Sequence, residues 1–394
     1  MLALLRSLFA PLAMLALASL PAIAAESFST SAPYAFLMDT DSHAVLFEKN
    51  ADDLTSPAST VKIMTAELIF REIKEGLINL DTKFTVSEHA WRTGGAGAGG
   101  SSMFAQVNSQ IRVEDLIRGL VVQSGNDAAI VFAEQLAGSE SAFGDMMTKR
   151  ARELGMEKST FRNPWGRYDP NQKVTAREMA MLADHVIRTY PDLYKYFGEK
   201  EFTWNKIRQQ NRNPLLFMEL GADGLKTGFI EDSGYGLVGS AVQNGQRLIV
   251  VINGCKSAKE RAEEARKLLQ WGFRAFEAKQ IFAAGEAVGS AKVYGGERGD
   301  VPLLASGPVK VLLPRGSGEK LSGRIVYDGP LIAPVEEGKQ VARLKIMRGQ
   351  TLALDLPLTT GDSVAVGSLP RRAMDAGLEY ATILFRKYVS KKDK

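Results

Sequence analysis

The hydrophobic pattern of this 394-residue chain changes near Glu277, and this change constrains the fold more than any other feature. Before it, apolar residues recur at the spacing of helices in some segments and of strands in others. From Ile281 to Leu369, short alternating segments are separated by Gly and Pro, which is typical of an all-β domain. A chain of this length fits two domains. We therefore expect a mixed α and β (α+β) domain at 26–277 and a small all-β domain at 280–368.

The first domain is predicted to have strands towards both of its ends and helices in its middle. One strand pair turns at Asp39-Thr40-Asp41-Ser42, and another is joined by Asn244-Gly245, a common hairpin turn. The expected helices are 61–69, 114–138 (interrupted at 124–126), 176–190 and 258–277. The expected strands are 35–38, 44–47, 235–242 and 247–252, followed in the second domain by 309–313, 323–327, 341–346 and 351–356.

The first 25 residues have the features of a secretory signal peptide. Arg6 supplies a positive charge, Leu8 to Leu20 form an apolar run, and Ala22-Ile23-Ala24 gives a cleavage site. The apolar run is short for a membrane span, although an uncleaved N-terminal anchor is the alternative. We expect residues 1–25 to be removed and the protein to be exported.

The last segment, 370–394, is predicted to be an amphipathic helix with a basic end. Its apolar stripe would comprise Met374, Leu378, Ala381, Phe385 and Tyr388. Such a helix can lie on an anionic membrane surface with its apolar face in the lipid boundary. The alternative is a helix that packs on its own domain and exposes a charged face to solvent.

Charge, cysteine and histidine content narrow the chemistry. The formal net charge is only +4, so nothing requires nucleic acid as a partner. The single cysteine, Cys255, allows no intramolecular disulfide, and its place in a predicted buried strand argues against a catalytic thiol. His43, His89 and His185 are scattered without metal-ligand spacing. We therefore expect no metal and no cofactor, and a serine nucleophile must find a base elsewhere.

Ser59-Thr60-Val61-Lys62 is the first of three short motifs that could carry chemistry. Residues three apart on a helix share a face, so the Lys62 amine can reach the Ser59 hydroxyl. A serine is a poor nucleophile until a base takes its proton, and lysine can be that base if burial and nearby cations keep it neutral. Alone the motif is weak evidence, because surface helices carry it by accident.

Two further motifs follow along the chain. Ser124-Gly125-Asn126 interrupts an apolar helical stretch, where the alternative explanation is a helix cap from Ser124 or Asn126. Lys226-Thr227-Gly228 fits an edge strand whose Lys and Thr face a cleft, with Gly228 leaving room for a substrate backbone. An ordinary charged edge is the alternative for this motif. Chance explains each motif alone more easily than all three in this order.

Together the motifs resemble the S-x-x-K, S-x-N and K-T-G set of penicillin-binding proteins and serine β-lactamases. The surrounding residues are most similar to the low-molecular-mass D-alanyl-D-alanine carboxypeptidases of the S11 peptidase family. This resemblance implies a transpeptidase-like catalytic domain, a β-rich domain and a terminal helix at the periplasmic face of the cytoplasmic membrane. The segments that carry it are Pro57 to Thr65, Gln123 to Ala128, Asn211 to Asn213 and Asp223 to Gly228.

The resemblance also implies a role for each motif residue. Ser59 would attack the peptide bond between two terminal D-alanines of a peptidoglycan stem, and Lys62 would take its proton. Ser124 would relay a proton to the departing nitrogen, while Lys226 would help to keep Lys62 neutral. Water would then release the acyl group, and β-lactams would act as covalent inhibitors. The implied binding residues are Asn126, Arg212, Lys226, Thr227, Gly228 and Phe229, the last through its backbone N–H in an oxyanion hole with that of Ser59.

Two features depart from the best-known members of this family. Phe229 stands where His is frequent, which predicts retained chemistry with a changed pH dependence or leaving-group preference. The glycine-rich segment 93–102 is followed by no Walker lysine, so it is not a phosphate cradle. We expect a mobile loop at the rim of the cleft, with a plain flexible loop as the alternative.

Three other functions share these motifs. A β-lactamase of class A would need a glutamate to activate the deacylating water, for which the sequence leaves Glu153, Glu157 and Glu178 as candidates. A transpeptidase or endopeptidase would use the same acyl-enzyme with other substrates. A non-catalytic peptidoglycan-binding protein would have decayed motifs, whereas every motif residue here is intact.

Overall fold

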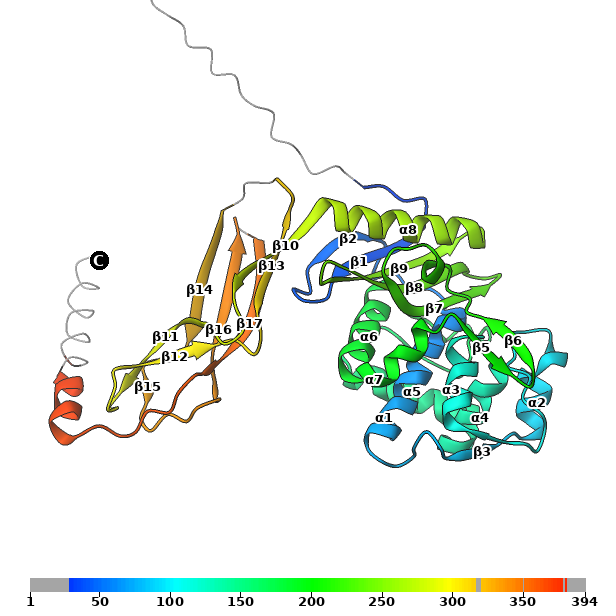
Figure 1. The fold of residues 1–394 in the computed structure, drawn as a ribbon, viewed down its shortest axis with the longest axis horizontal. Helices are drawn as coiled ribbons and strands as arrows, with labels where there is room; N and C mark the ends of the chain where they lie inside the picture. The colour runs from blue at the N-terminus through cyan, green and yellow to red at the C-terminus, as the bar shows by residue number, and fades with distance from the viewer. Residues whose placement is uncertain (1–27, 317–319, 350, 378–379, 381–394) are drawn as a thin grey trace, which may run out of the picture.

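The computed structural model describes residues 28–316, 320–349, 351–377 and 380, and it contains two domains joined end to end (Figure 1). The first has an antiparallel sheet with helices on both faces, and the second is built from strands. The predicted mixed architecture is therefore confirmed.

The first domain contains all of the long helices that the structure describes. Its strands are β1 (Tyr34–Asp39), β2 (Val45–Lys49), β3 (Lys83–Thr85), β4 (Gln110–Arg112), β5 (Glu201–Trp204), β6 (Ile207–Gln210), β7 (Ala222–Ile230), β8 (Gly234–Gln243) and β9 (Gln246–Cys255). Its α-helices are α1 (Lys62–Lys74), α2 (Glu88–Gly94), α3 (Val113–Val121), α4 (Asn126–Ala137), α5 (Glu140–Glu153), α6 (Ala176–Thr189), α7 (Pro191–Tyr194) and α8 (Ala258–Ala275). Its 3₁₀ helices are η1 (Ala58–Val61), η2 (Ala96–Ala98), η3 (Lys195–Gly198) and η4 (Pro214–Phe217).

The main sheet has the strand order β2-β1-β9-β8-β7, which places β7 at an edge. All four pairings are antiparallel. The hairpin between β8 and β9 turns at Asn244 and Gly245, whose φ angles of 51° and 77° suit a two-residue turn. The strand pairs predicted at both ends of this domain are confirmed, and so is the edge position of the Lys226 motif.

Strand alternation divides the core of the first domain between the two faces of the sheet. Ala35 and Leu37 face α8, while Phe36 and Met38 belong to the core on the opposite face. Successive side chains of a strand point to opposite faces, so a single strand serves both cores. In Figure 1, α8 lies along one face and the remaining helices gather below the other.

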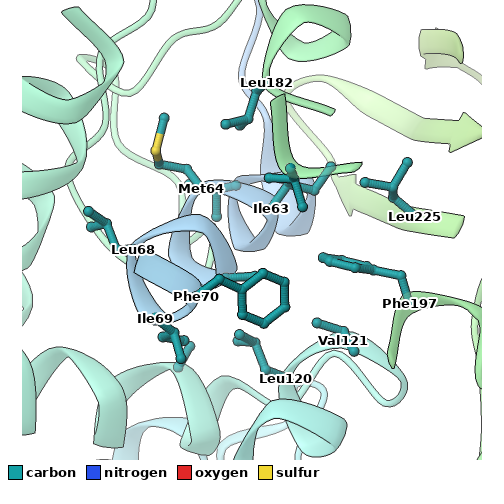
Figure 2. Packing of buried hydrophobic residues seen from close by; sticks show 14 of the residues in the cluster. Ile63, Met64, Leu68, Ile69, Phe70, Leu120, Val121, Leu182, Phe197 and Leu225 are labelled. Carbon is teal, nitrogen blue, oxygen red and sulfur yellow. The ribbon is translucent and has the colours of Figure 1, made fainter. Parts of the chain in front are cut away.

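Helix α1 runs through the middle of the larger core (Figure 2). Its apolar side chains pack between helices α3 and α6, the η3 turn and strand β7, all of which contribute buried residues. Tight packing on every side leaves little freedom for the backbone of this helix. The residues at its start are therefore held in fixed positions. The labelled contacts are Ile63, Met64, Leu68, Ile69 and Phe70 of α1 with Leu120, Val121, Leu182, Phe197 and Leu225.

The second domain begins directly after α8, because β10 starts at the residue that follows Ala275. Its strands are β10 (Phe276–Phe282), β11 (Ala287–Tyr294), β12 (Asp300–Leu304), β13 (Val309–Pro314), β14 (Leu321–Tyr327), β15 (Leu331–Ile332), β16 (Gln340–Arg348) and β17 (Thr351–Thr360). A six-stranded sheet has the order β14-β16-β17-β12-β11-β15, and β10 pairs with β13. An ion pair of 3.3 Å between Lys310 Nζ and the Asp41 carboxylate links this domain to the first.

Both predicted targeting segments fall largely outside the described residues. Residues 1–25 are not described, and the predicted terminal helix is described only at 369–377 and 380, where it is helical. Among the described helices, none combines the length and hydrophobicity that a membrane span requires.

Candidate active site

Ser59 lies in η1, immediately before the long helix α1. Lys62 is the first residue of α1, and its Nζ lies 3.1 Å from Ser59 Oγ. Ala58, just before the serine, has a φ of 48°, an uncommon value for a residue with a side chain. The packed helix therefore holds the hydroxyl and the amine within hydrogen-bond distance, as the sequence predicted.

Lys62 is fully buried, and two oxygens besides that of Ser59 surround its amine. Asn126 Oδ1 lies 2.8 Å and the Trp165 carbonyl 2.7 Å from Nζ. A neutral amine has two N–H donors and one lone pair. When the two oxygens accept those donors, the lone pair is left for the Ser59 proton.

The pKa of Lys62 is lowered well below its ordinary value, chiefly because burial disfavours the charged amine. The positive charges of Lys226 and Arg212 lower it further, while Asp127 opposes them. A lowered pKa increases the neutral fraction of a lysine, and only the neutral amine can accept a proton. The electrostatics of the site thus favour a general base at this position.

Ser124 lies in the turn between α3 and α4, with its hydroxyl in the same cleft. It has a φ of 69°, and its buried Oγ has no hydrogen-bond partner among the described residues. The helix-cap explanation of this motif is wrong: the N-cap of α4 is Gly125, with no side-chain capping bond. A buried hydroxyl left free costs free energy, so this group is available for a substrate.

Asp127 fixes the turn that carries Ser124 and Asn126. This buried carboxylate accepts hydrogen bonds from the Ser102 hydroxyl (2.7 Å), Met103 N (2.9 Å) and Ala105 N (3.0 Å). It thereby ties the start of α4 to the end of the glycine-rich segment. Sequence reasoning did not assign this residue a role, although its place directly after the S-x-N motif was the available signal.

Strand β7 brings the third motif to the cleft. Lys226 is buried, and Thr227 lines the cleft. Burial, together with the charges of Arg212 and Arg261, lowers the pKa of Lys226 to about 7. Lys226 Nζ lies 3.3 Å from the Thr227 carbonyl. The third motif thus places a second lysine with a lowered pKa close enough for its charge to act on the Lys62 amine.

The cleft itself has a volume of about 920 Å³. Of the residues predicted from the sequence, Ser59, Ser124, Asn126, Arg212, Thr227, Gly228 and Phe229 line it. Lys62 and Lys226 are buried beneath its floor. Among the described lining residues none is acidic, so the cleft favours anionic ligands. Those that the sequence did not predict include Trp165, Gly166, Arg167, Tyr168, Tyr235 and Arg261.

The glycine-rich segment reaches the cleft, as predicted. Gly99, Gly100 and Ser101 line it, but part of the segment is helical, since α2 ends at Gly94 and η2 follows. A Cβ on Gly100 would lie 2.7 Å from the Asn126 Nδ2. A side chain at position 100 would therefore displace the amide of Asn126. The predicted mobility of the segment stays a prediction.

Phe229 exposes 47% of its surface at the rim of the cleft. Its ring stacks on that of Tyr235 with 4.1 Å between the centroids. The side chain is therefore held by a neighbour and offers an apolar surface beside Thr227. The expected effect of this residue on pH dependence or leaving group stays a prediction.

A serine at the cleft paired with a buried lysine, a second serine without a partner among the described residues, and an edge strand beside a cationic cleft define a serine acyl-transfer enzyme of the penicillin-binding class. Comparison with known proteins agrees with this class. Residues 21–257 match the D-alanyl-D-alanine carboxypeptidase family (peptidase S11), and residues 276–366 match the C-terminal domain of penicillin-binding protein 5. The chain therefore belongs to the S11 family of D-alanyl-D-alanine carboxypeptidases, as its motifs predicted.

Individual relatives cover nearly the whole chain. The D-alanyl-D-alanine carboxypeptidase DacC of Escherichia coli is 39% identical over 379 residues, which cover 94% of this chain and 95% of that protein. The crystal structure of penicillin-binding protein 5 from Haemophilus influenzae superposes with a TM-score of 0.78 at 36% identity, covering 86% of this chain and 99% of that one. Penicillin-binding protein D2 of Listeria monocytogenes, solved with ampicillin bound, has a TM-score of 0.57 at 28% identity and covers 63% of this chain and 99% of its own.

Proposed function

We propose that this protein removes the terminal D-alanine from peptidoglycan stem peptides that end in D-Ala-D-Ala, through an acyl-enzyme on Ser59. The observation that carries the proposal is the 3.1 Å contact between Ser59 Oγ and a buried Lys62 amine whose pKa is lowered. This pair lies at the floor of a cleft without acidic lining among the described residues, and the peptide substrate ends in a carboxylate.

In the first step, Ser59 Oγ attacks the carbonyl carbon of the scissile peptide bond and its proton moves to Lys62. The negative charge that develops on the carbonyl oxygen is stabilised by the backbone N–H groups of Ser59 and Phe229. Collapse of the tetrahedral intermediate breaks the C–N bond, and the proton reaches the leaving nitrogen through Ser124. Free D-alanine departs and the acyl group remains on Ser59.

Binding of the substrate is assigned to the walls of the cleft. Thr227 and Arg212, with Lys226 behind them, receive the terminal carboxylate, and Asn126 pairs with the peptide backbone. Gly228 lets the substrate strand approach the edge of the sheet at β7. In the second step a water attacks the ester and returns the proton to Ser59, which restores the free enzyme.

The assay for this proposal follows D-alanine release from a pentapeptide that ends in D-Ala-D-Ala. We expect release by the wild type, inhibition by penicillin, and a loss of at least a thousandfold in Ser59→Ala. Ser257→Ala is a matched control, because Ser257 caps α8 outside the cleft. Release that persists in Ser59→Ala and in the presence of penicillin would refute the proposal.

The structure offers little support for the β-lactamase alternative of class A type. Glu178, one of the three candidate glutamates, accepts hydrogen bonds from the backbone of Lys158 and Ser159. In the described part of the chain, neither Glu178 nor Glu153 or Glu157 lines the cleft. The same assay separates the alternatives, since rapid turnover of penicillin would indicate a lactamase, and transfer to an added amine a transpeptidase.

We further propose that the protein is exported and held at the periplasmic face of the cytoplasmic membrane. The support is the signal-like sequence at 1–25 and the amphipathic pattern at 370–394. Between these two segments, the proposed catalytic domain occupies residues 26–277 and the β-rich domain residues 280–368. The latter would act as a stalk between membrane and cleft.

A further inference from the structure

Two chain segments bring glycines against the backbone of Ser59. A Cβ on Gly228 would lie 3.1 Å from Ser59 N, and a Cβ on Gly166 would lie 2.8 Å from the same atom. Adjacent Cα atoms are about 3.8 Å apart. Phe229 and Arg167 directly follow these glycines and both line the cleft, so each side chain starts one residue away from a close contact with Ser59.

The backbone of Arg167 is firmly held. Asn163 Oδ1 accepts hydrogen bonds from Gly166 N (2.8 Å) and Arg167 N (3.0 Å), and Asn163 Nδ2 donates to the Arg167 carbonyl (3.0 Å). Gln172 Nε2 donates to the same carbonyl at 3.3 Å. The position from which the Arg167 side chain extends is thus fixed relative to Ser59.

The side chain of Arg167, in contrast, is left without an acidic partner. It is exposed at the cleft and stands 5.9 Å from the centre of the Trp165 ring, and no carboxylate among the described residues pairs with it. Arg162 on the same segment is also exposed, but it pairs with Asp145 at 3.7 Å and does not line the cleft. Arg167 is therefore a free cation placed beside the reacting centre.

The terminal carboxylate of the substrate does not need this cation. In the proposed function that carboxylate is bound by Thr227 and Arg212, which belong to another wall of the cleft. The leaving D-alanine carries no second carboxylate. An anionic group that meets Arg167 must therefore belong to the acyl-donor part of the peptide, upstream of the scissile bond.

We propose that Arg167, with Tyr168 beside it, is a specificity subsite for a carboxylate in the acyl-donor part of the substrate. The inference rests on the proposed function and deepens it: the preferred stem peptide carries a free side-chain carboxylate at one of the two residues that precede D-Ala-D-Ala. A guanidinium and a carboxylate at an exposed site give an advantage of roughly three- to tenfold, which is weakened by salt.

The test compares acetylated tetrapeptides X-X-D-Ala-D-Ala that differ only by Glu against Gln at one of the two X positions. We expect the wild type to show a kcat/KM roughly three- to tenfold higher for Glu at one position, mainly through KM. In Arg167→Gln this ratio should fall to about one, and in Arg167→Lys part of it should remain. Arg162→Gln, the matched control, should keep the wild-type ratio. Added salt should reduce the Glu-to-Gln ratio of the wild type.

A second readout does not depend on peptide hydrolysis. Carbenicillin differs from benzylpenicillin by one carboxylate on the acyl side chain, so the ratio of their acylation rates reports on the same subsite. Arg167→Gln should lower this ratio by roughly three- to tenfold. The inference is overturned if the wild type shows no preference for the carboxylate in either assay, or if the preference survives in Arg167→Gln. If neither peptide is hydrolysed although both penicillins acylate the enzyme normally, the carboxypeptidase proposal is refuted. The ratio of the two acylation rates then decides whether Arg167 forms the subsite.

Discussion

At the scale of single residues, the proposed mechanism depends on a lysine whose pKa is lowered. Lys62 is buried, its two N–H donors have acceptors in Asn126 and the Trp165 carbonyl, and Lys226 adds a positive charge nearby. Burial and the neighbouring positive charge both disfavour the charged amine. The lowered pKa of Lys62 favours the proposed transfer of the Ser59 proton to its amine.

The charge on Lys226 can be tested by its effect on Lys62. In Lys226→Met the positive charge is removed, so the pKa of Lys62 should rise. Because the base must be unprotonated, the acid limb of the acylation rate should move to higher pH by on the order of one unit. The measurement is the pH profile of penicillin acylation. The control is Lys200→Met, because Lys200 is exposed and lies outside the cleft; this variant should leave the acid limb of the pH profile unchanged. A shift of the acid limb to lower pH in Lys226→Met would contradict the account.

The residues that the sequence revealed are those in recognisable short motifs. Ser59, Lys62 and Thr227 belong to short motifs whose residue types are dictated by the chemistry. Trp165 acts on Lys62 through its backbone carbonyl, which any residue type could supply. Its contribution therefore has no sequence signal, and only the fold brings it to Lys62.

At the scale of elements, the site is assembled where helix starts and an edge strand meet. The starts of α1 and α4 provide Lys62 and Asn126, and β7 provides Thr227. Most of the long helices and the main strands were predictable, because their apolar spacing extends over many residues, but the 14-residue helix α5 was not predicted. The short pairs β3–β4 and β5–β6 were missed, since three or four residues carry no clear period.

The start of α4 should depend on the carboxylate of Asp127. In Asp127→Asn an amide would face donors now satisfied by the carboxylate, which should lower the free energy of unfolding by roughly 2–4 kcal/mol. Thermal and denaturant unfolding measure this loss. Asp145→Asn, at an exposed position of α5, should change stability by less than about 0.5 kcal/mol. Equal stability of both variants would contradict the assigned role.

Position 166 should tolerate no side chain. A Cβ there would collide with the Ala58 carbonyl, and the φ of 94° is itself unfavourable for alanine. Gly166→Ala should therefore reduce the rate of penicillin acylation by at least about tenfold. Gly97→Ala is the matched control, since a Cβ at Gly97 meets nothing within 4 Å. Wild-type acylation by Gly166→Ala would show that the close approach to η1 is not needed.

At the scale of the whole molecule, the cleft and its supports lie in the first domain. The second domain contributes none of the described lining residues, and Figure 1 shows it extending away from α8. The division into two domains could be predicted, because the change from mixed to alternating patterns occurs at one place. The order of strands in the second domain could not, since pairing between distant segments leaves no local signal.

The proposed membrane association depends on the C-terminal segment 370–394. Deleting the residues after Pro370 should transfer the protein from the membrane fraction to the soluble fraction, because the amphipathic segment is then lost. Penicillin acylation should stay within about twofold, since the described lining residues all precede this point. Fractionation of cells that express each form measures the first effect. A truncated protein that still sediments with membranes would refute the anchor.

The most direct test of the central claim is to identify the residue that becomes acylated. The purified protein is incubated with benzylpenicillin, and its intact mass and peptide masses are measured. We predict one adduct per chain, located on the peptide that contains Ser59 and absent in Ser59→Ala, while Ser257→Ala is labelled as the wild type. An adduct on another residue, or no adduct on a folded protein, would contradict the account.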